Sequence, residues 1–233
     1  MNTYNIAGLT VNMEPSCETT LTQSEKYRCS DSASPDIIID LNRNYIENLN
    51  RDNAHLSYNE CEYMSAGAQF YTQLIRYNGF LIHSSALAYE NKAYLFSAPS
   101  GTGKSTHALL WKKVFGEENV ISINDDKPAL RLIDGKYFVF GTPFSGKTDQ
   151  NENMCVPIQG ICILNRAEEN SIQPITAREA LVPLLNQTIR PTEKIGMEKL
   201  LTLLDLLIQT VPIYKMGCNI SLEAPKIAYA SMK

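Results

Sequence analysis

The segment at residues 93–106, Ala-Tyr-Leu-Phe-Ser-Ala-Pro-Ser-Gly-Thr-Gly-Lys-Ser-Thr, constrains the fold more than any other part of this chain. A short apolar run typical of a strand leads into a glycine-containing turn and then an amphipathic helix. Such a turn offers an anion several unpaired N–H groups and the positive end of the helix dipole. Gly101 and Gly103 let the backbone approach phosphate oxygens closely, where a Cβ atom would intrude. The segment therefore predicts a phosphate-binding (Walker A) loop in an α/β protein.

The side chains around the glycines predict ATP and Mg²⁺ as the ligands of this loop. Lys104 is placed to reach the β- and γ-phosphates, and the Ser105 hydroxyl is placed to bind Mg²⁺. Ala98 stands where the strict pattern has glycine. The alternative is a chance match in a surface turn, but the strand before and the helix after argue against it. The residues expected to bind the nucleotide are Ser100, Gly101, Thr102, Gly103, Lys104, Ser105 and Thr106.

Two adjacent carboxylates follow the next apolar strand. Residues 120–124, Val-Ile-Ser-Ile-Asn, lead directly into Asp125 and Asp126. A phosphate loop needs a carboxylate for its metal ion, usually at the end of a neighbouring strand. One carboxylate can hold Mg²⁺ while the other accepts the proton of an attacking hydroxyl. In the alternative, the pair forms a solvated turn before Pro128.

His83 and Lys147 are further candidates for the site. His83 precedes two serines on the strand before the loop strand, and Lys147 ends a second glycine-bearing loop at 141–147. A tight hairpin would bring His83 beside the phosphate strand, and Lys147 would steady a phosphoryl group or a substrate anion. A core histidine and an ordinary surface lysine are the alternatives, which the sequence leaves open.

Strand and helix signals mixed with hairpins predict an α/β fold with a mixed sheet and flanking helices. Ser57-x-x-Glu and Thr176-x-x-Glu are capping boxes that open helices, and Asp134-Gly135 is the strongest hairpin signal. The expected strands are 4–11, 35–40, 80–88, 93–97, 120–124, 128–133, 136–140, 157–165, 171–175 and 211–218. The expected helices are 58–77, 104–115, 176–186, a leucine-rich segment at 200–207 and a last helix from 221.

A chain of 233 residues fits one main domain with a small lobe attached. We expect a strand-rich N-terminal lobe at 1–56, with an irregular segment at 14–34, and a kinase-like core containing the phosphate loop at 57–233. The composition does not fix the oligomeric state, so a homo-oligomer stays open.

Composition and charge exclude several classes of protein. With 25 acidic and 21 basic residues the net charge is −4, whereas proteins that coat nucleic acids are usually basic. The sequence contains no apolar run long enough for a membrane span and does not begin like a signal peptide, so we expect a cytoplasmic protein. Six dispersed cysteines and three dispersed histidines predict free thiols and no zinc site.

The order His83-Ser-Ser-Ala-Leu, phosphate loop, Asp125-Asp126 resembles the catalytic domain of HPr kinase/phosphorylase. It is more similar to the shorter HPr-kinase-related proteins, some of which phosphorylate a serine hydroxyl in ribosomal-peptide pathways. The phosphoenolpyruvate carboxykinases share this core more distantly. The resemblance spans about residues 80–147 and implies an HPr-kinase-like fold.

The resemblance also implies a role for each matching residue. Lys104 and Ser105 would bind phosphates and metal, Asp125 would be the base for the acceptor hydroxyl, and Asp126 would assist with metal or proton, beside His83. The chain departs from the family at Ala98, at Thr106 in place of a glutamate, in its short N-terminal part and in lacking a clear phosphorolysis segment. Because of those departures, it stays open whether HPr is the acceptor and whether the reverse reaction occurs.

These observations predict an ATP-dependent kinase, a phosphotransferase with an alcohol-group acceptor. The expected acceptor is a serine of a peptide or protein. One alternative is a kinase for a small hydroxylated metabolite, and another is a nucleotide-binding regulatory protein without catalysis. A carboxykinase has the least support, because the sequence shows neither its metal-ligand set nor arginines to clamp a dicarboxylate.

Overall fold

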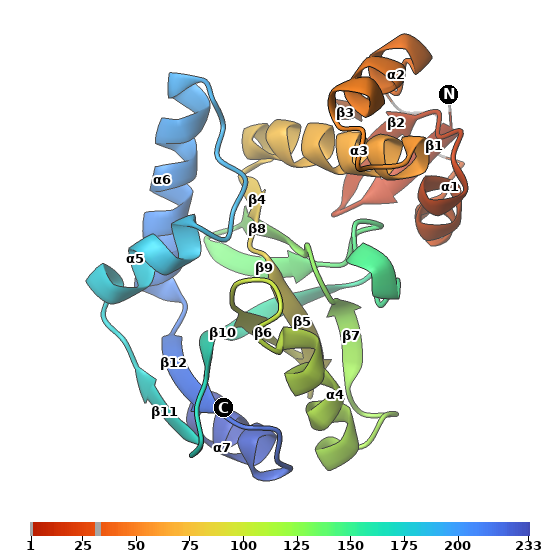
Figure 1. The fold of residues 1–233 in the computed structure, drawn as a ribbon. Helices are drawn as coiled ribbons and strands as arrows, with labels where there is room; N and C mark the ends of the chain where they lie inside the picture. The colour runs from red at the N-terminus through yellow and green to blue at the C-terminus, as the bar shows by residue number, and fades with distance from the viewer. Residues whose placement is uncertain (1, 31–33) are drawn as a thin grey trace.

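A mixed sheet of nine strands organises most of the chain in the computed structural model, which describes residues 2–30 and 34–233 (Figure 1). Seven strands follow one path, β11 pairs with β12, and β12 pairs with β10. The path runs β4 (Gly79–Leu81), β8 (Ala129–Ile133), β9 (Lys136–Phe140), β10 (Cys155–Arg166), β6 (Lys92–Ser97), β5 (Ser84–Tyr89) and β7 (Ile121–Asn124), and the remaining strands are β11 (Ser171–Pro174) and β12 (Ile213–Cys218).

The long strand β10 makes the sheet mixed. Its first residues pair antiparallel with β9, while its later residues pair parallel with β6 and β12. The carboxyl ends of β6, β10 and β12 therefore meet at one edge, where ligands of open α/β sheets commonly bind. The phosphate loop leaves β6 at this edge.

Side chains alternate between the two faces of β6 and assign the helices to those faces. Tyr94 and Phe96 share a buried cluster with Trp111 of α4 (Lys104–Phe115) and with α7 (Glu223–Met232). Ala93 and Leu95 belong to the cluster that contains α5 (Ala177–Leu185) and α6 (Lys194–Thr210). The phosphate strand is thus covered on both faces, which fixes the loop that follows it.

The N-terminal part differs from the expected strand-rich lobe. The expected strand 4–11 is a hairpin of β1 (Asn2–Ile6) and β2 (Leu9–Met13), and β3 (Ile37–Ile38) completes a small sheet. Two helices were not predicted, α1 (Glu18–Ser24) and α2 (Arg43–Asp52). Helix α2 buries only Ile46, so it has no apolar stripe to predict it. Helix α1 occupies part of the segment expected to be irregular, of which residues 31–33 lie outside the described residues.

Helix α3 (Tyr58–Leu74), continued by the 3-10 turn η2 (Ile75–Tyr77), lies between the N-terminal sheet and the main sheet (Figure 1). Phe70 of α3 shares a buried cluster with Val11 of β2 and with Phe140 of β9. The capping box at Ser57 is present as predicted. The division of the chain after residue 56 stays a prediction.

The fold class expected from the sequence is confirmed: an α/β structure with a mixed sheet, flanking helices and a small N-terminal sheet. The six cysteines are free thiols, as predicted. In the described part of the chain no helix combines the length and the apolar character needed to cross a membrane.

Glu62 joins α1 to α3 and offers a test of this packing. Its fully buried carboxylate accepts hydrogen bonds from the N–H groups of Ser16 and Cys17, at 3.1 and 2.9 Å, just before α1. Burial alone would raise the pKa of Glu62, but a hydrogen bond from the Ser16 hydroxyl, together with those from the two N–H groups, outweighs it and lowers the pKa. The ionised form is therefore the one that stabilises the fold.

We predict that Glu62→Gln lowers the unfolding free energy by about 2 kcal/mol at pH 7, because charge-assisted hydrogen bonds are lost. A lowered folded pKa stabilises the protein above the unfolded pKa, and this stabilisation is lost as pH falls through the folded value. The difference between the two proteins should therefore shrink on acidification. Urea unfolding at neutral and acidic pH measures it, with exposed Glu198→Gln as the control. An equal difference at both pH values would contradict the prediction.

Candidate active site

The phosphate loop joins β6 to α4 as the sequence predicts. Gly103 is the N-cap of α4 and has a φ of 123°, and Gly101 has a φ of 76°, so both need the conformational freedom of glycine. The space that a Cβ atom would occupy at either position is free of other atoms within 4 Å. The loop therefore presents open backbone to a ligand at the start of a helix.

Lys104 is nearly buried, at 8% exposure, and its Nζ donates to the carbonyl oxygen of Ala98 at 3.0 Å. Burial lowers the pKa of this amine, and the negative charges of Asp126 and Asp125 partly offset the shift. The ammonium group thus lies within the loop and in the field of both carboxylates. A bound phosphate would supply the counter-charge that the loop carbonyl only partly replaces.

Arg166 supports the loop from the end of β10. Its Nε donates to the carbonyl oxygen of Thr102 at 3.2 Å. Its Nη2 donates to the carbonyl oxygen of Gly101. These bonds tie the loop to the end of β10. No local pattern singles out Arg166, because its contact with the loop depends on the parallel pairing of β10 with β6.

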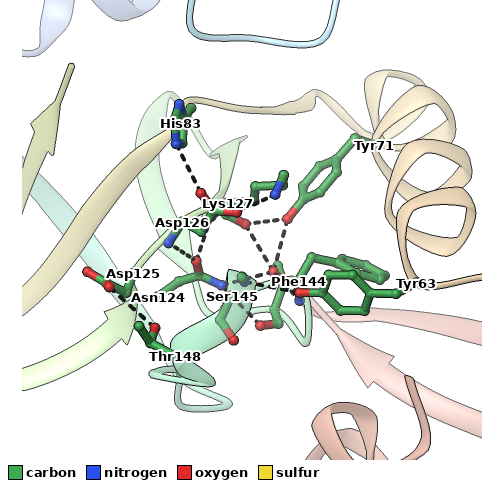
Figure 2. A network of polar contacts seen from close by, with 12 residues as sticks. Tyr63, Tyr71, His83, Asn124, Asp125, Asp126, Lys127, Phe144, Ser145 and Thr148 are labelled. Atoms are coloured by element: carbon green, nitrogen blue, oxygen red, sulfur yellow. Dashed lines mark hydrogen bonds and ion pairs between the residues drawn. The ribbon is translucent and has the colours of Figure 1, made fainter. Parts of the chain in front are cut away.

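An interruption between β4 and β5 positions His83. The segment expected as one strand, 80–88, pairs first with β8 and then, after Ile82 and His83, with β6 and β7. His83 Nε2 lies 3.0 Å from Asp126 Oδ1 (Figure 2). His83 Nδ1 lies 3.0 Å from Gln187 Oε1. The backbone N–H of His83 also donates to the Gln187 carbonyl at 2.7 Å. The imidazole is therefore held in the site between two oxygen atoms.

The turn that carries the carboxylates is fixed by Asn124, which is fully buried at the end of β7. Its Oδ1 accepts the N–H groups of Asp126 and Lys127 at 2.9 and 2.7 Å, and its Nδ2 donates to the carbonyl oxygen of Thr142 at 3.0 Å. Asparagine side chains form such local turns readily. The backbone here is tied into the structure, unlike that of a loosely solvated turn.

The two carboxylates have different partners (Figure 2). Asp126 pairs with His83 and with Lys127 Nζ. Burial alone would raise its pKa, but the His83 hydrogen bond and the Lys127 charge lower it to about 2. Asp125 instead accepts hydrogen bonds from two hydroxyls, Ser85 Oγ at 2.6 Å and Thr148 Oγ1 at 3.3 Å. Asp126 is therefore tied to a histidine and a lysine, whereas Asp125 is oriented by two hydroxyls.

Two adjoining cavities contain the candidate residues. A smaller one of about 280 Å³ is lined by the phosphate loop, Lys104, Ser105 and Thr106, together with His83, Asp125 and Asp126. A larger one of about 880 Å³ shares Ser100, Ser105 and the two aspartates, and extends to Lys147 and to polar residues of α1 and α3. The structure thus brings most of the predicted residues to the smaller cavity. Lys147 lies exposed at the larger one, and Thr102 lines neither.

The residues at the smaller cavity fit a magnesium ion. Mg²⁺ is bound by oxygen atoms, usually one or two carboxylates together with substrate phosphates. Ser105 and Asp126 offer such atoms, and the low pKa of Asp126 keeps it ionised. No cluster of three or more His, Cys, Asp or Glu side chains suited to a metal occurs in residues 2–30 and 34–233.

Sequence reasoning missed several residues of the site, namely Ser85, Lys127, Thr148, Arg166 and Gln187. Three of them adjoin residues that were singled out: Ser85 belongs to the His-Ser-Ser sequence, Lys127 follows the aspartate pair, and Thr148 follows Lys147. Their position next to predicted site residues was the only signal by which the sequence could have indicated these three. Gln187 contacts His83 across 104 positions of the sequence, and no local pattern announces it.

Comparison with known proteins finds a distant structural likeness. No protein-family model matches the chain, and no curated protein matches it. Among solved structures, the HPr(Ser) kinase/phosphatase from Coxiella burnetii is similar with a TM-score of 0.35 and 13% identity. The match covers 65% of this chain and 93% of that chain. A TM-score and an identity this low indicate a distant fold relationship and say nothing about the reaction.

Proposed function

We propose that this protein is an ATP-dependent kinase that transfers the γ-phosphate to a hydroxyl group, specifically a serine hydroxyl of a peptide or protein. One observation carries the proposal: Lys104 and Ser105 of the phosphate loop line the same cavity as Asp125 and Asp126. Phosphoryl transfer needs little covalent chemistry from the protein and depends on positioning and charge neutralisation. The cavity combines groups for both tasks.

The phosphate side of the cavity is built by the loop. Its free N–H groups, the start of α4 and the Lys104 ammonium neutralise the triphosphate. Ser105 and Asp126 would hold Mg²⁺, which when bound offsets the charge that develops on the transferred group. Lys147, which lines the larger cavity, would contact an anionic group there.

The different partners of the carboxylates support a division of labour between them. Asp126, with a pKa lowered to about 2, is a weak base but a good ligand for a cation. Asp125 is oriented by Ser85 and Thr148 and has no cationic side chain bound to it in the described part of the chain. We assign Asp125 as the base that accepts the proton of the acceptor hydroxyl.

The larger cavity is the proposed acceptor site. It begins at Ser105 and Asp125 and continues between α1 and α3, where Asn59, Glu60 and Met64 are among its lining residues. Cavities that bury drug-sized ligands span roughly 300–1,000 Å³, so about 880 Å³ is ample for several peptide residues. A mixed polar lining suits a peptide backbone, which carries both donors and acceptors. These features favour a peptide over a small metabolite.

A transfer assay tests the proposal. The full chain is incubated with Mg²⁺, γ-labelled ATP and a degenerate pool of serine-containing peptides, beside a pool with alanine in place of serine. Label should pass to the serine pool only. Transfer to free hydroxylated metabolites but to neither peptide pool would show that the acceptor is a small molecule and not a peptide. Binding of ATP without any transfer would overturn the kinase assignment.

A further inference from the structure

The loop between β9 and β10 connects α1 and α3 to the catalytic carboxylates. Its middle is the 3-10 turn η3 (Gly146–Thr148). The Gly146 N–H donates to Tyr63 Oη at 3.1 Å, and Gln23 Nε2 donates to the Gly146 carbonyl oxygen at 3.1 Å. Tyr63 Oη also donates to the Pro143 carbonyl oxygen at 3.3 Å. Both backbone groups of Gly146 are therefore held by side chains of α1 and α3.

The far end of this loop is anchored in the same way, at the nearly buried Asn151. Tyr27 Oη donates to Asn151 Oδ1, and Lys26 Nζ donates to its carbonyl oxygen, both at 2.7 Å. Asn151 Nδ2 donates in turn to Ser145 Oγ at 2.8 Å. The N-terminal part of the chain thus fixes the loop on both sides of η3.

Between these anchors the loop touches both carboxylates. Thr148 Oγ1 donates to Asp125 Oδ2 at 3.3 Å. A Cβ atom on Gly146, whose φ is 74°, would lie 3.2 Å from side-chain atoms of Asp126. A shift of η3 would therefore change the orientation of Asp125, because Thr148 and Ser85 are the hydroxyls that hold its two oxygens.

Tyr63 is suited to act through this loop. Its ring packs against Phe144 with centroids 5.9 Å apart, so the ring is held by packing as well as by the hydroxyl. Burial raises the pKa of Tyr63, which keeps the hydroxyl protonated and able to donate and accept at once. Figure 2 shows Tyr63, Phe144 and Ser145 beside the carboxylate pair.

We propose that Tyr63 is a positioning residue for phosphoryl transfer: through its hydrogen bond to Gly146 it sets the position of Thr148 and thereby orients Asp125. This inference rests on the proposed function, because it assigns Asp125 as the base. It makes the N-terminal helices part of the catalytic apparatus, although they contribute no residue to the phosphate loop.

A double-mutant cycle tests the inference in the full-length protein with Mg²⁺, ATP and the serine-peptide pool. Tyr63→Phe removes the hydroxyl and keeps the ring, and Thr148→Val removes the hydroxyl that reaches Asp125. Each should lower kcat about 10-fold and leave the KM for ATP unchanged, since misplacing a catalytic group affects the chemical step. Because Tyr63 acts through Thr148, the double variant should be no slower than Thr148→Val alone. Thr148→Ser, which keeps a hydroxyl, should restore transfer.

Tyr77→Phe is the matched control, because Tyr77 Oη donates to the Asp36 carbonyl oxygen at 2.5 Å, on η2 and away from the loop. It should leave kcat unchanged even if it lowers thermal stability as much as Tyr63→Phe does. Fully multiplicative losses, or equal loss in the control, would overturn the inference and leave the kinase proposal standing. A wild-type protein that binds ATP through Lys104 and transfers nothing would overturn both.

Discussion

Replacing Lys104 by methionine should reduce phosphoryl transfer by about 10³-fold, because the loop loses the charge that stabilises the triphosphate and the transferring group. Methionine keeps most of the buried stem, and the ammonium is already desolvated by its burial. Removing such a buried charge need not destabilise the fold. We therefore expect the thermal midpoint of the nucleotide-free variant to match or exceed that of the wild type. Calorimetric titration with Mg²⁺ and ATP, together with the transfer assay, measures both effects.

Lys113→Met is the matched control, because Lys113 lies exposed on the same helix, α4. It should bind nucleotide and transfer phosphate like the wild type. The role given to Lys104 would be contradicted if Lys104→Met bound Mg²⁺ and ATP with unchanged affinity and kept its transfer rate. Loss of both together with a large fall in thermal midpoint would point to a structural role instead.

Asp125→Asn should lower the transfer rate by about 10³-fold and change the affinity for ATP only a few-fold, since the general base acts in the chemical step. Asparagine has the same shape and keeps an oxygen that can accept the Ser85 hydroxyl. The phosphate loop is not altered. A rapid-mixing measurement of a single turnover separates the loss in chemistry from any loss in binding.

Asp134→Asn controls for the chemistry of the substitution. Asp134 is exposed in the β8–β9 hairpin with a φ of 48°, a conformation that asparagine also adopts readily. That variant should be fully active. If Asp125→Asn kept near-normal transfer, the base would have to be another group, and Asp126→Asn would be the next variant to measure.

Local patterns predicted the parts of this structure that depend on neighbouring residues. The phosphate loop, α4 and the β8–β9 hairpin follow from glycine positions, apolar periodicity and the Asp-Gly turn. The tight hairpin of β5 and β6 that was expected to bring His83 beside the phosphate strand is also present, and Ser97 Oγ donates to the His83 carbonyl oxygen at 2.9 Å. Each of these features is recorded within a short stretch of sequence.

Other parts depend on contacts between distant segments. The continuous apolar run at 80–88 gave no sign that it divides at Ile82 and His83, because the division arises from pairing with different strands. The start of helix α1 is held by Glu62, which accepts a hydrogen bond from the N–H group of Cys17 across 45 positions of the sequence. Tyr63 reaches Gly146 across 83 positions. Pairings over such distances leave no periodic signal in a single sequence.

The central claim is that the loop lysine and the aspartate pair form one catalytic site for a hydroxyl acceptor. Phosphorus NMR tests it most directly, on the full chain with Mg²⁺, ATP and a panel of serine peptides and hydroxylated metabolites, beside an Asp125→Asn sample. We predict a new phosphoester signal that grows as the γ-phosphate signal of ATP declines, and that is absent from the variant. Intact ATP in the wild-type sample, with a Lys104-dependent shift showing that it is bound, would contradict the claim.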